Sequence, residues 1–173
     1  MMGKVRLRRL EEKDIPGMLE WMHDPEINQW FRFDAANMTE DRVRDFIAGS
    51  FSEQDRHYAI TDDSDEYFGT ISLEDIDMEN RHALYAISLR ACCQGRGIAA
   101  EATHLLLDIA FHELELERVH LNVIADNTRA KRFYEKVGFR YEGCFHKHLL
   151  LRGEWRDWDW YAILREDYDA GNN

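Results

Sequence analysis

The sequence predicts a single α/β (α+β) domain with a central mixed, mostly antiparallel sheet and helices on both of its faces. Its 173 residues match the size of one domain. Hydrophobic residues make up 45% of the chain and charged residues 32%, a balance typical of globular proteins. Segments with the two-residue alternation of strands fill the middle of the chain, and segments of helical periodicity lie around them. No repeat or linker interrupts this pattern, so we expect residues 1–173 to form one domain.

The first fifty residues are predicted to form a short strand followed by helices. Alternating apolar and basic residues indicate a strand over residues 4–9. Asp14 followed closely by Pro16 is typical of a helix start, because aspartate caps free N–H groups and proline is tolerated in the first turn. A short helix or turn is expected over residues 26–33, and a further helix is expected to begin near Thr39.

The rest of the chain is predicted to combine strands with two longer helices. One helix is expected to follow a glycine-containing loop and begin near Ile98, and the other is expected after Asn127, which suits a helix cap. The second helix should end at Gly138, because glycine followed by an apolar residue is a common helix stop. Residues 170–173 are expected to be frayed. Strands are expected over residues 57–61, 67–77, 83–90, 119–124, 139–151 and 158–164.

Charge and cysteine content exclude several classes of protein. The net charge of −12 argues against nucleic-acid binding, which needs a basic surface. It is consistent with a cationic substrate and equally with an ordinary acidic surface. Cys92, Cys93 and Cys144 have the spacing of neither a disulfide framework nor a metal site, so we expect a reduced, cytoplasmic protein without a metal. We find no apolar run typical of a signal peptide or a membrane span and expect no membrane partner.

A loop between a strand and a helix carries the first functional motif. Its glycines permit a sharp turn or a close approach to a ligand, and its free N–H groups lead into a helix N-terminus, which favours a bound phosphate. An ordinary strand-to-helix turn explains an isolated Gly-x-Gly equally well. The loop lacks the Lys-Ser/Thr of an ATP-binding P-loop and the third glycine of a dinucleotide fingerprint. It consists of Gln94, Gly95, Arg96, Gly97, Ile98 and Ala99.

A second motif, in residues 122–139, changes the interpretation of the loop. Together the two motifs resemble the GNAT N-acetyltransferase superfamily, most closely its spermidine/spermine and ribosomal-protein-alanine acetyltransferase branch. The resemblance covers almost the whole chain. The pyrophosphate loop of that family, Gln/Arg-x-x-Gly-x-Gly/Ala, is matched by Gln94, Gly97 and Ala99. Its later motif is matched by Asn127, Ala130, Tyr134, Glu135, Lys136, Gly138 and Phe139.

The resemblance implies that acetyl-CoA is the co-substrate and that the chain forms a homo-oligomer, a dimer or larger. In the family the loop amides hold the pyrophosphate. The preceding strand pairs with the pantetheine arm and polarises the thioester carbonyl, here through the N–H of Leu89. These contacts come from the backbone, so the strand is equally expected to belong to the core. The cofactor-binding residues implied are Ile87, Ser88, Leu89, Gln94, Gly95, Arg96, Gly97, Ile98, Ala99 and Asn127.

Three residues are candidates for the chemistry. The resemblance implies that Tyr134 protonates the leaving thiolate, and a phenol with a pKa of about 10 still carries its proton at neutral pH. Without the motif, a tyrosine on this helix face would be interpreted as core. Glu74 or Asp75 is expected to accept the proton of the amine, and an exposed acid at a strand end is an equally good interpretation of either. His120, His146 and His148 are interpreted as structural.

The acceptor is expected to be the primary amine of a small molecule, a polyamine or an amino sugar. Aromatic side chains suit a cation or a sugar ring, and carboxylates suit an ammonium group. Polyamine enzymes of the family have glutamates where this chain has Phe33 and Leu84, which weakens the polyamine assignment. An N-terminal protein amine and a non-catalytic acyl-CoA-binding role are the alternatives. The expected acceptor-binding residues are Trp30, Phe31, Phe33, Asp34 and Tyr85.

Overall fold

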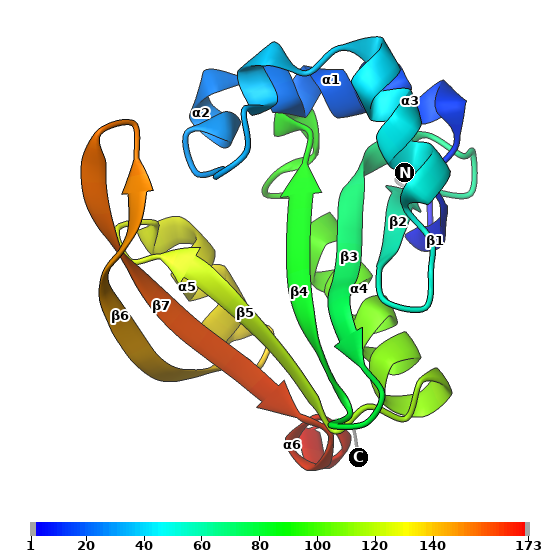
Figure 1. Ribbon diagram of the computed structural model, residues 1–173. Helices are drawn as coiled ribbons and strands as arrows, with labels where there is room; N and C mark the ends of the chain where they lie inside the picture. Colours follow the sequence, from blue (N-terminus) through cyan, green and yellow to red (C-terminus); the bar gives the residue numbers. More distant parts are fainter. Residues whose placement is uncertain (1–2, 172–173) are drawn as a thin grey trace.

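The centre of the molecule is one seven-stranded sheet, seen in the computed structural model, which describes residues 3–171 (Figure 1). The strands lie in the order β1-β2-β3-β4-β5-β7-β6. Among the strands of the described residues, only β4 and β5 pair in parallel, and every other pair is antiparallel. The predicted mixed, mostly antiparallel sheet is therefore confirmed. The strands are β1 (Arg6–Arg9), β2 (Arg56–Thr61), β3 (Tyr67–Asp77), β4 (His82–Leu89), β5 (Arg118–Ile124), β6 (Arg140–Leu151) and β7 (Glu154–Leu164).

Helices cover both faces of the sheet, as predicted. Ala59 packs with the core under α1 and α3, whereas its neighbours Tyr58 and Ile60 pack with the core under α4, because successive side chains of a strand point to opposite faces. In Figure 1, α1, α2 and α3 gather at one end of the sheet, and α4 lies behind β3 and β4. The helices are α1 (Ile15–His23), α2 (Pro25–Asn28), α3 (Glu40–Gly49), α4 (Ile98–Asp108, continued by a π-helical turn over Ile109–Glu113), α5 (Thr128–Lys136) and α6 (Arg165–Gly171).

The parallel pair at the centre of the sheet separates along its length. β4 and β5 pair only from His82 opposite Arg118 to Leu84 opposite His120. Beyond Leu84 the two strands diverge, and Figure 1 shows the opening between them. Within the part of the chain that the structure describes, the edge of β4 that faces β5 therefore has no strand partner from Tyr85 onward. Backbone N–H and C=O groups along that edge are free to pair with a ligand.

Two sequence predictions about the helices were wrong. Asp14 precedes α1 but does not cap it: its carboxylate accepts hydrogen bonds from Arg8 (2.8 Å from each of two guanidinium nitrogens) and from the N–H of Glu11 (2.9 Å). An ion pair with the neighbouring strand thus replaces the cap. The end of the chain is also more ordered than expected, because Ala170 and Gly171 belong to α6. Residues 172–173 of the predicted frayed end lie outside the described residues. No helix within residues 3–171 is long and apolar enough to cross a membrane.

Candidate active site

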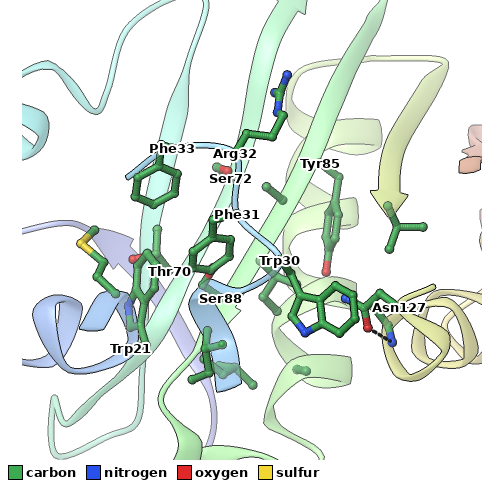
Figure 2. Close-up of a pocket in the computed structure, with 18 of the residues that line it drawn as sticks. Trp21, Trp30, Phe31, Arg32, Phe33, Thr70, Ser72, Tyr85, Ser88 and Asn127 are labelled. Carbon is green, nitrogen blue, oxygen red and sulfur yellow. Dashed lines mark hydrogen bonds between the residues drawn. The ribbon is translucent and has the colours of Figure 1, made fainter. Parts of the chain in front are cut away.

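A cavity of about 1350 Å³ occupies the opening between β4 and β5. Its walls come from α1 and the segment after α2, from β3, β4 and β5, and from the glycine loop and α5 (Figure 2). Segments far apart in the sequence therefore meet around one space. Most of the site residues predicted from the sequence line it: Trp30, Phe31, Phe33, Glu74, Tyr85, Ile87, Ser88, Leu89, Gln94, Gly95, Ala99, Asn127 and Tyr134. Five others do not: Asp34, Asp75, Arg96, Gly97 and Ile98.

The glycine loop presents open backbone at the start of α4. Gly95 and Gly97 have φ values of 73° and 82°, a left-handed conformation that side chains rarely adopt. A Cβ atom at either glycine would meet nothing within 4 Å, so space for a ligand remains above both. Gly97 is the N-cap of α4, and no side chain within residues 3–171 caps this helix. The free N–H groups and the positive end of the helix dipole therefore suit a phosphate group.

Two other loop residues, Ile98 and Arg96, do not offer their side chains to the cavity. The side chain of Ile98 is fully buried in the core, so Ile98 anchors the loop and only its backbone is available to a ligand. Arg96 also belongs to the loop, but its side chain is exposed and does not line the cavity. The loop thus relies on backbone rather than on side chains.

The free edge of β4 is held in place by a close contact with β3. Ile87, Ser88 and Leu89 line the cavity, and β4 pairs on its other edge with β3, where Leu89 lies opposite Gly69. A Cβ atom on Gly69 would lie 2.2 Å from the carbonyl oxygen of Ser88. Only glycine permits this approach. Gly69 was not singled out from the sequence, because a glycine inside a strand carries no signal of what lies beside it.

Tyr134 belongs both to an aromatic cluster and to the cavity wall. Its ring packs against Phe133, Tyr85 and Phe139 at centroid distances of 5.5, 6.0 and 6.1 Å. Burial raises the pKa of Tyr134 to about 12, and no charged or hydrogen-bonding neighbour contributes to the shift. At neutral pH the hydroxyl is therefore protonated, and it is able to donate to a group inside the cavity. The core and catalytic interpretations of this tyrosine are compatible.

The neighbouring residues Asn127 and Tyr85 use their polar atoms inside the protein. The side-chain oxygen of Asn127 accepts a hydrogen bond from the N–H of Ala130 (3.2 Å), which confirms the predicted helix cap (Figure 2). Tyr85 is only 3% exposed, and its hydroxyl lies 2.8 Å from the hydroxyl oxygen of Thr103 on α4. Tyr85 thus contributes a ring face to the cavity, while its hydroxyl is already engaged in the core.

An aromatic wall lies at the other end of the cavity. Phe31 stacks on Phe33 at 5.2 Å and packs edge-on against Trp21 at 5.5 Å. Figure 2 shows these rings beside β3, close to Thr70 and Ser72. Arg32, between the two phenylalanines, lies over the ring of Trp158 at 4.7 Å. Trp158 on β7 therefore also forms part of the cavity wall.

An acidic group with a histidine lies beside this wall on β2 and β3. The Ser72 hydroxyl donates to Glu74 Oε1 (2.7 Å), and His57 Nδ1 lies 3.8 Å from the same oxygen. Burial lowers the pKa of His57, so the ring is mainly neutral near pH 7. His57 was missed from the sequence, because only the pairing of β2 with β3 places it opposite Ser72.

The two neighbouring acids predicted on β3 are separated by the structure. Glu74 lines the cavity, but Asp75 is exposed and has a φ of 49° where the β3–β4 ladder is irregular. The bulge turns Asp75 outside the cavity, where its N–H donates to Asp55 Oδ1 (3.1 Å). Asp34 is likewise outside the cavity, with its carboxylate accepting from Asn37 at 2.9 and 3.0 Å. Local turns thus withdraw two of the predicted acids from the cavity wall.

Carboxylates outnumber cations in the cavity wall. This balance favours a positively charged occupant, because carboxylates replace the water around an ammonium group. The two arginines lie apart, with Arg32 over Trp158 and Arg129 on α5. The acids that line the cavity are Asp24, Glu26, Asp55 and Glu74.

Comparison with known proteins gives three findings. Residues 4–140 match the family model described as an acetyltransferase (GNAT) domain. The chain is 34% identical over 128 residues to the probable N-acetyltransferase YjcK of Bacillus subtilis, covering 73% of this chain and 71% of that protein. It is 27% identical over 171 residues to the spermidine N(1)-acetyltransferase of Escherichia coli strain K12, covering 96% and 89%.

The fold is also similar to solved structures. The crystal structure of spermidine N-acetyltransferase from Vibrio cholerae in complex with CoA and spermine superposes with a TM-score of 0.86. The two chains are 23% identical, and the match covers 95% of this chain and 98% of the other. At this identity the likeness concerns the fold.

Proposed function

This chain belongs to the GNAT acetyltransferase family, and from that premise we propose that it transfers the acetyl group of acetyl-CoA to a primary amine of a small cationic molecule. One observation carries the proposal. A single cavity joins an open glycine loop, the free edge of β4 and a protonated tyrosine to an aromatic and acidic pocket. The first three features suit the donor, and the last suits an ammonium-bearing acceptor.

The cavity residues fit acetyl-CoA at one end. The backbone N–H groups of residues 95–99 would hold the pyrophosphate at the start of α4, where no side-chain cap is described and the glycines leave space. The unpaired edge of β4 is suited to pair with the amide groups of the pantetheine arm, and the N–H of Leu89 would polarise the carbonyl under attack. When bound, acetyl-CoA supplies the acetyl group as a thioester, which an amine is able to attack.

Two sets of side chains would handle the protons. Glu74 would bind the ammonium group of the acceptor. A proton of that ammonium group would then pass to Glu74 itself or to the neutral His57 beside it. The free amine then attacks the carbonyl. Tyr134, still protonated because burial raises its pKa, donates its proton to the departing sulfur. His57 and Tyr134 therefore each begin in the protonation state that their step requires.

A polyamine is the acceptor that the charges favour. Four carboxylates in the lining suit a molecule with several ammonium groups, and aromatic rings such as Phe31 suit the alkyl chain and cations between them. The 27% identity to the E. coli spermidine enzyme supports the same class. Arg32 at the aromatic wall instead suits an acceptor with hydroxyl groups, as an amino sugar has.

A panel of amines tests this function directly. Thiol release from acetyl-CoA should rise with spermidine and spermine above the rate without an amine. An amino sugar and a peptide with a free N-terminus, offered at the same concentration, should give less. A preference for either of these would replace the polyamine assignment. Binding of acetyl-CoA without thiol release for any amine would instead indicate a non-catalytic acyl-CoA-binding domain.

A further inference from the structure

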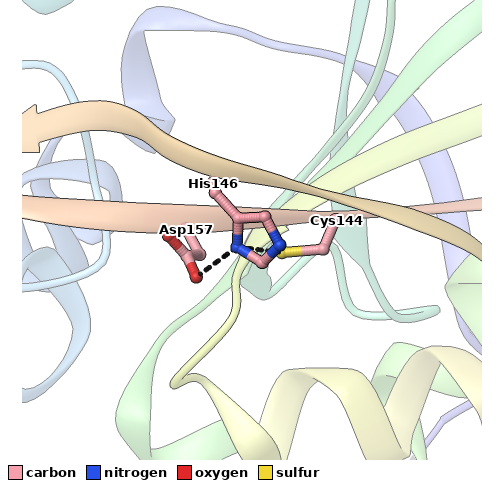
Figure 3. Close-up of side chains that lie close together, drawn as sticks. All are labelled: Cys144, His146 and Asp157. Atoms are coloured by element: carbon pink, nitrogen blue, oxygen red, sulfur yellow. Dashed lines mark hydrogen bonds and ion pairs between the residues drawn. The ribbon is translucent and has the colours of Figure 1, made fainter.

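Three side chains of the kinds that bind transition metals converge on the outer hairpin of the sheet, away from the cavity. Cys144 and His146 lie on β6 and Asp157 lies on β7, and their Sγ, ring-nitrogen and carboxylate-oxygen atoms are all within 4.8 Å of one another (Figure 3). Cys144 pairs with Asp159 across the ladder, whose register shifts after Phe145, and just beyond that point the ring of His146 contacts the carboxylate of Asp157 directly. None of the three lines the cavity.

The geometry does not suit a cysteine nucleophile. In a Cys–His–acid relay the acid holds one ring nitrogen and the thiol contacts the other. Here Asp157 Oδ2 (2.9 Å) and Cys144 Sγ (3.8 Å) both face Nδ1 of His146. A single ring nitrogen cannot donate to the carboxylate and accept from the thiol. Partial burial and the nearby Asp159 also raise the pKa of Cys144, which keeps the thiol protonated when no cation is near.

We propose that Cys144, His146 and Asp157 form a binding site for a zinc ion, with water as the fourth ligand. Thiolate, imidazole and carboxylate together suit a borderline-soft ion, and harder ions such as Mn²⁺ less well. Tetrahedral zinc with these ligands requires ligand–ligand distances of about 3.3–3.6 Å. The two distances to His146 Nδ1, 2.9 and 3.8 Å, lie within about half an ångström of this range, and the cysteine sulfur and the carboxylate, which are within 4.8 Å of each other, would move together around the ion.

Neighbouring groups already orient the site. The N–H of Lys147 donates to Asp157 Oδ1 (2.7 Å), which leaves Oδ2 turned toward His146. Such hydrogen bonds to ligands are typical of metal sites. The side chain of His146 is 79% exposed, so water is able to reach a bound ion. Asp159, opposite Cys144, is engaged by Lys131 at 2.5 Å and is not needed as a ligand.

A bound ion would join β6 to β7 where their ladder is interrupted. The register shifts directly beside the site, and Lys147 there has a φ of 49°. Beyond it, Arg152 at the hairpin end donates to the carbonyls of Gln29 (2.8 Å) and Asn28 (3.1 Å), next to the aromatic wall. Zinc should therefore stabilise the folded chain and the hairpin that supports this wall. No metal was predicted from the sequence, because that prediction considered only the spacing of the cysteines. Asp157 comes from a different strand and is brought to Cys144 by the fold.

Metal titration of the whole chain, stripped of metal with a chelator, tests the proposal. Because Cys92 and Cys93 are adjacent with their sulfur atoms 3.6 Å apart, the titration uses a Cys92→Ser, Cys93→Ala background. Calorimetry should give one Zn²⁺ per chain, bound more tightly than Mn²⁺. Co²⁺ should give a thiolate-to-metal charge-transfer band, and Zn²⁺ should raise the melting temperature. No zinc binding, or no such band with Co²⁺, would overturn the proposal.

Variants assign the binding to these residues. Cys144→Ser should remove the charge-transfer band, and His146→Gln and Asp157→Asn should each weaken Zn²⁺ binding by at least about tenfold. His148→Ala is the matched control: His148 lies on the same strand but its ring packs at a tilt against Trp158 at 4.8 Å, and its loss should leave Zn²⁺ binding unchanged. Circular dichroism verifies that each variant is folded. A band that survives Cys144→Ser would show that the ion binds elsewhere.

Discussion

At the scale of single residues, burial determines which groups are chemically useful. Tyr134 is surrounded by aromatic rings, and this desolvation raises its pKa to about 12. Burial has the opposite effect on the pKa of His57, because there the charged form is the protonated one. One physical cause therefore keeps a proton on the tyrosine and off the histidine. These are the states that an acid and a base require.

Replacing Tyr134 with phenylalanine keeps the packed ring and removes only the proton. We expect kcat to fall by about 10²–10⁴-fold, the usual contribution of a positioned acid, while acetyl-CoA binding changes little. Steady-state kinetics and calorimetric titration with acetyl-CoA measure the two effects. In the parent enzyme, loss of this proton should not lower the rate until the pH approaches about 12. A Tyr134→Phe variant with unchanged kcat would leave this residue a purely structural role.

Glu74 and Asp75 form a matched pair for testing the proton acceptor. Glu74→Gln should lower kcat/KM by about 10²-fold or more, whereas Asp75→Asn should have little effect because Asp75 lies outside the cavity. Asparagine also tolerates the left-handed backbone at position 75. An equal loss for both variants, or a larger loss for Asp75→Asn, would contradict the assignment of the cavity wall.

The pH dependence of turnover separates binding from proton transfer at this site. His57 has a lowered pKa, so it becomes protonated only as the pH falls below its ordinary value of about 6.5. Turnover should therefore fall on the acid side in the parent. For the same reason, the stability that the neutral ring contributes is present above about pH 6.5 and is lost below it. A loss in Glu74→Gln that is large near neutral pH and shrinks as the pH approaches the pKa of an alkyl ammonium, about 10.4, indicates a base, and a loss uniform across pH indicates ammonium binding alone.

At the scale of elements, the site depends on the departure of β5 from β4. The two strands pair over three residues and then separate, so one edge of β4 is free while the other remains fixed to β3. A strand with one free edge offers a ligand a row of backbone groups at fixed spacing. The close approach of Gly69 to Ser88 determines where that row lies.

Adding a methyl group at Gly69 should shift β4. In Gly69→Ala the new Cβ would lie 2.2 Å from the Ser88 carbonyl oxygen and 2.9 Å from Leu89 Cα, so the strands must move apart. We expect a stability loss of about 1–3 kcal/mol and weaker acetyl-CoA binding, measured by denaturant unfolding and calorimetry. Gly49→Ala in α3 is the control, because a Cβ there meets nothing within 4 Å. Unchanged acetyl-CoA binding in Gly69→Ala would contradict the role of this edge.

At the scale of the whole molecule, the net negative charge concerns which ligands reach the cavity, and the exposed apolar side chains at the outer edge of the sheet concern association with other chains. The net charge of −12 and the acidic cavity both favour cations, which charge complementarity steers toward the site. β6 is an outer strand of the sheet, and large apolar side chains are exposed on it and at the start of β7, among them Tyr141, Leu150 and Trp155. The expected homo-oligomer stays a prediction.

Local sequence patterns alone determined the α/β class, most element positions and the two motifs around Gly97 and Tyr134. Those features depend on neighbours along the chain: β3 began and ended where its alternation predicted, and Asn127 capped α5. The helix α6 was missed because it lacks a comparable signal.

Only the tertiary structure decided which side chains share a space. Glu74 and Asp75 are adjacent in sequence, yet a bulge directs one to the cavity and the other away from it. His57 comes beside Glu74 through the pairing of β2 with β3, and Asp157 comes beside His146 through the pairing of β6 with β7. Strand register and the irregularities within it are set by contacts between distant segments, and no local pattern records them.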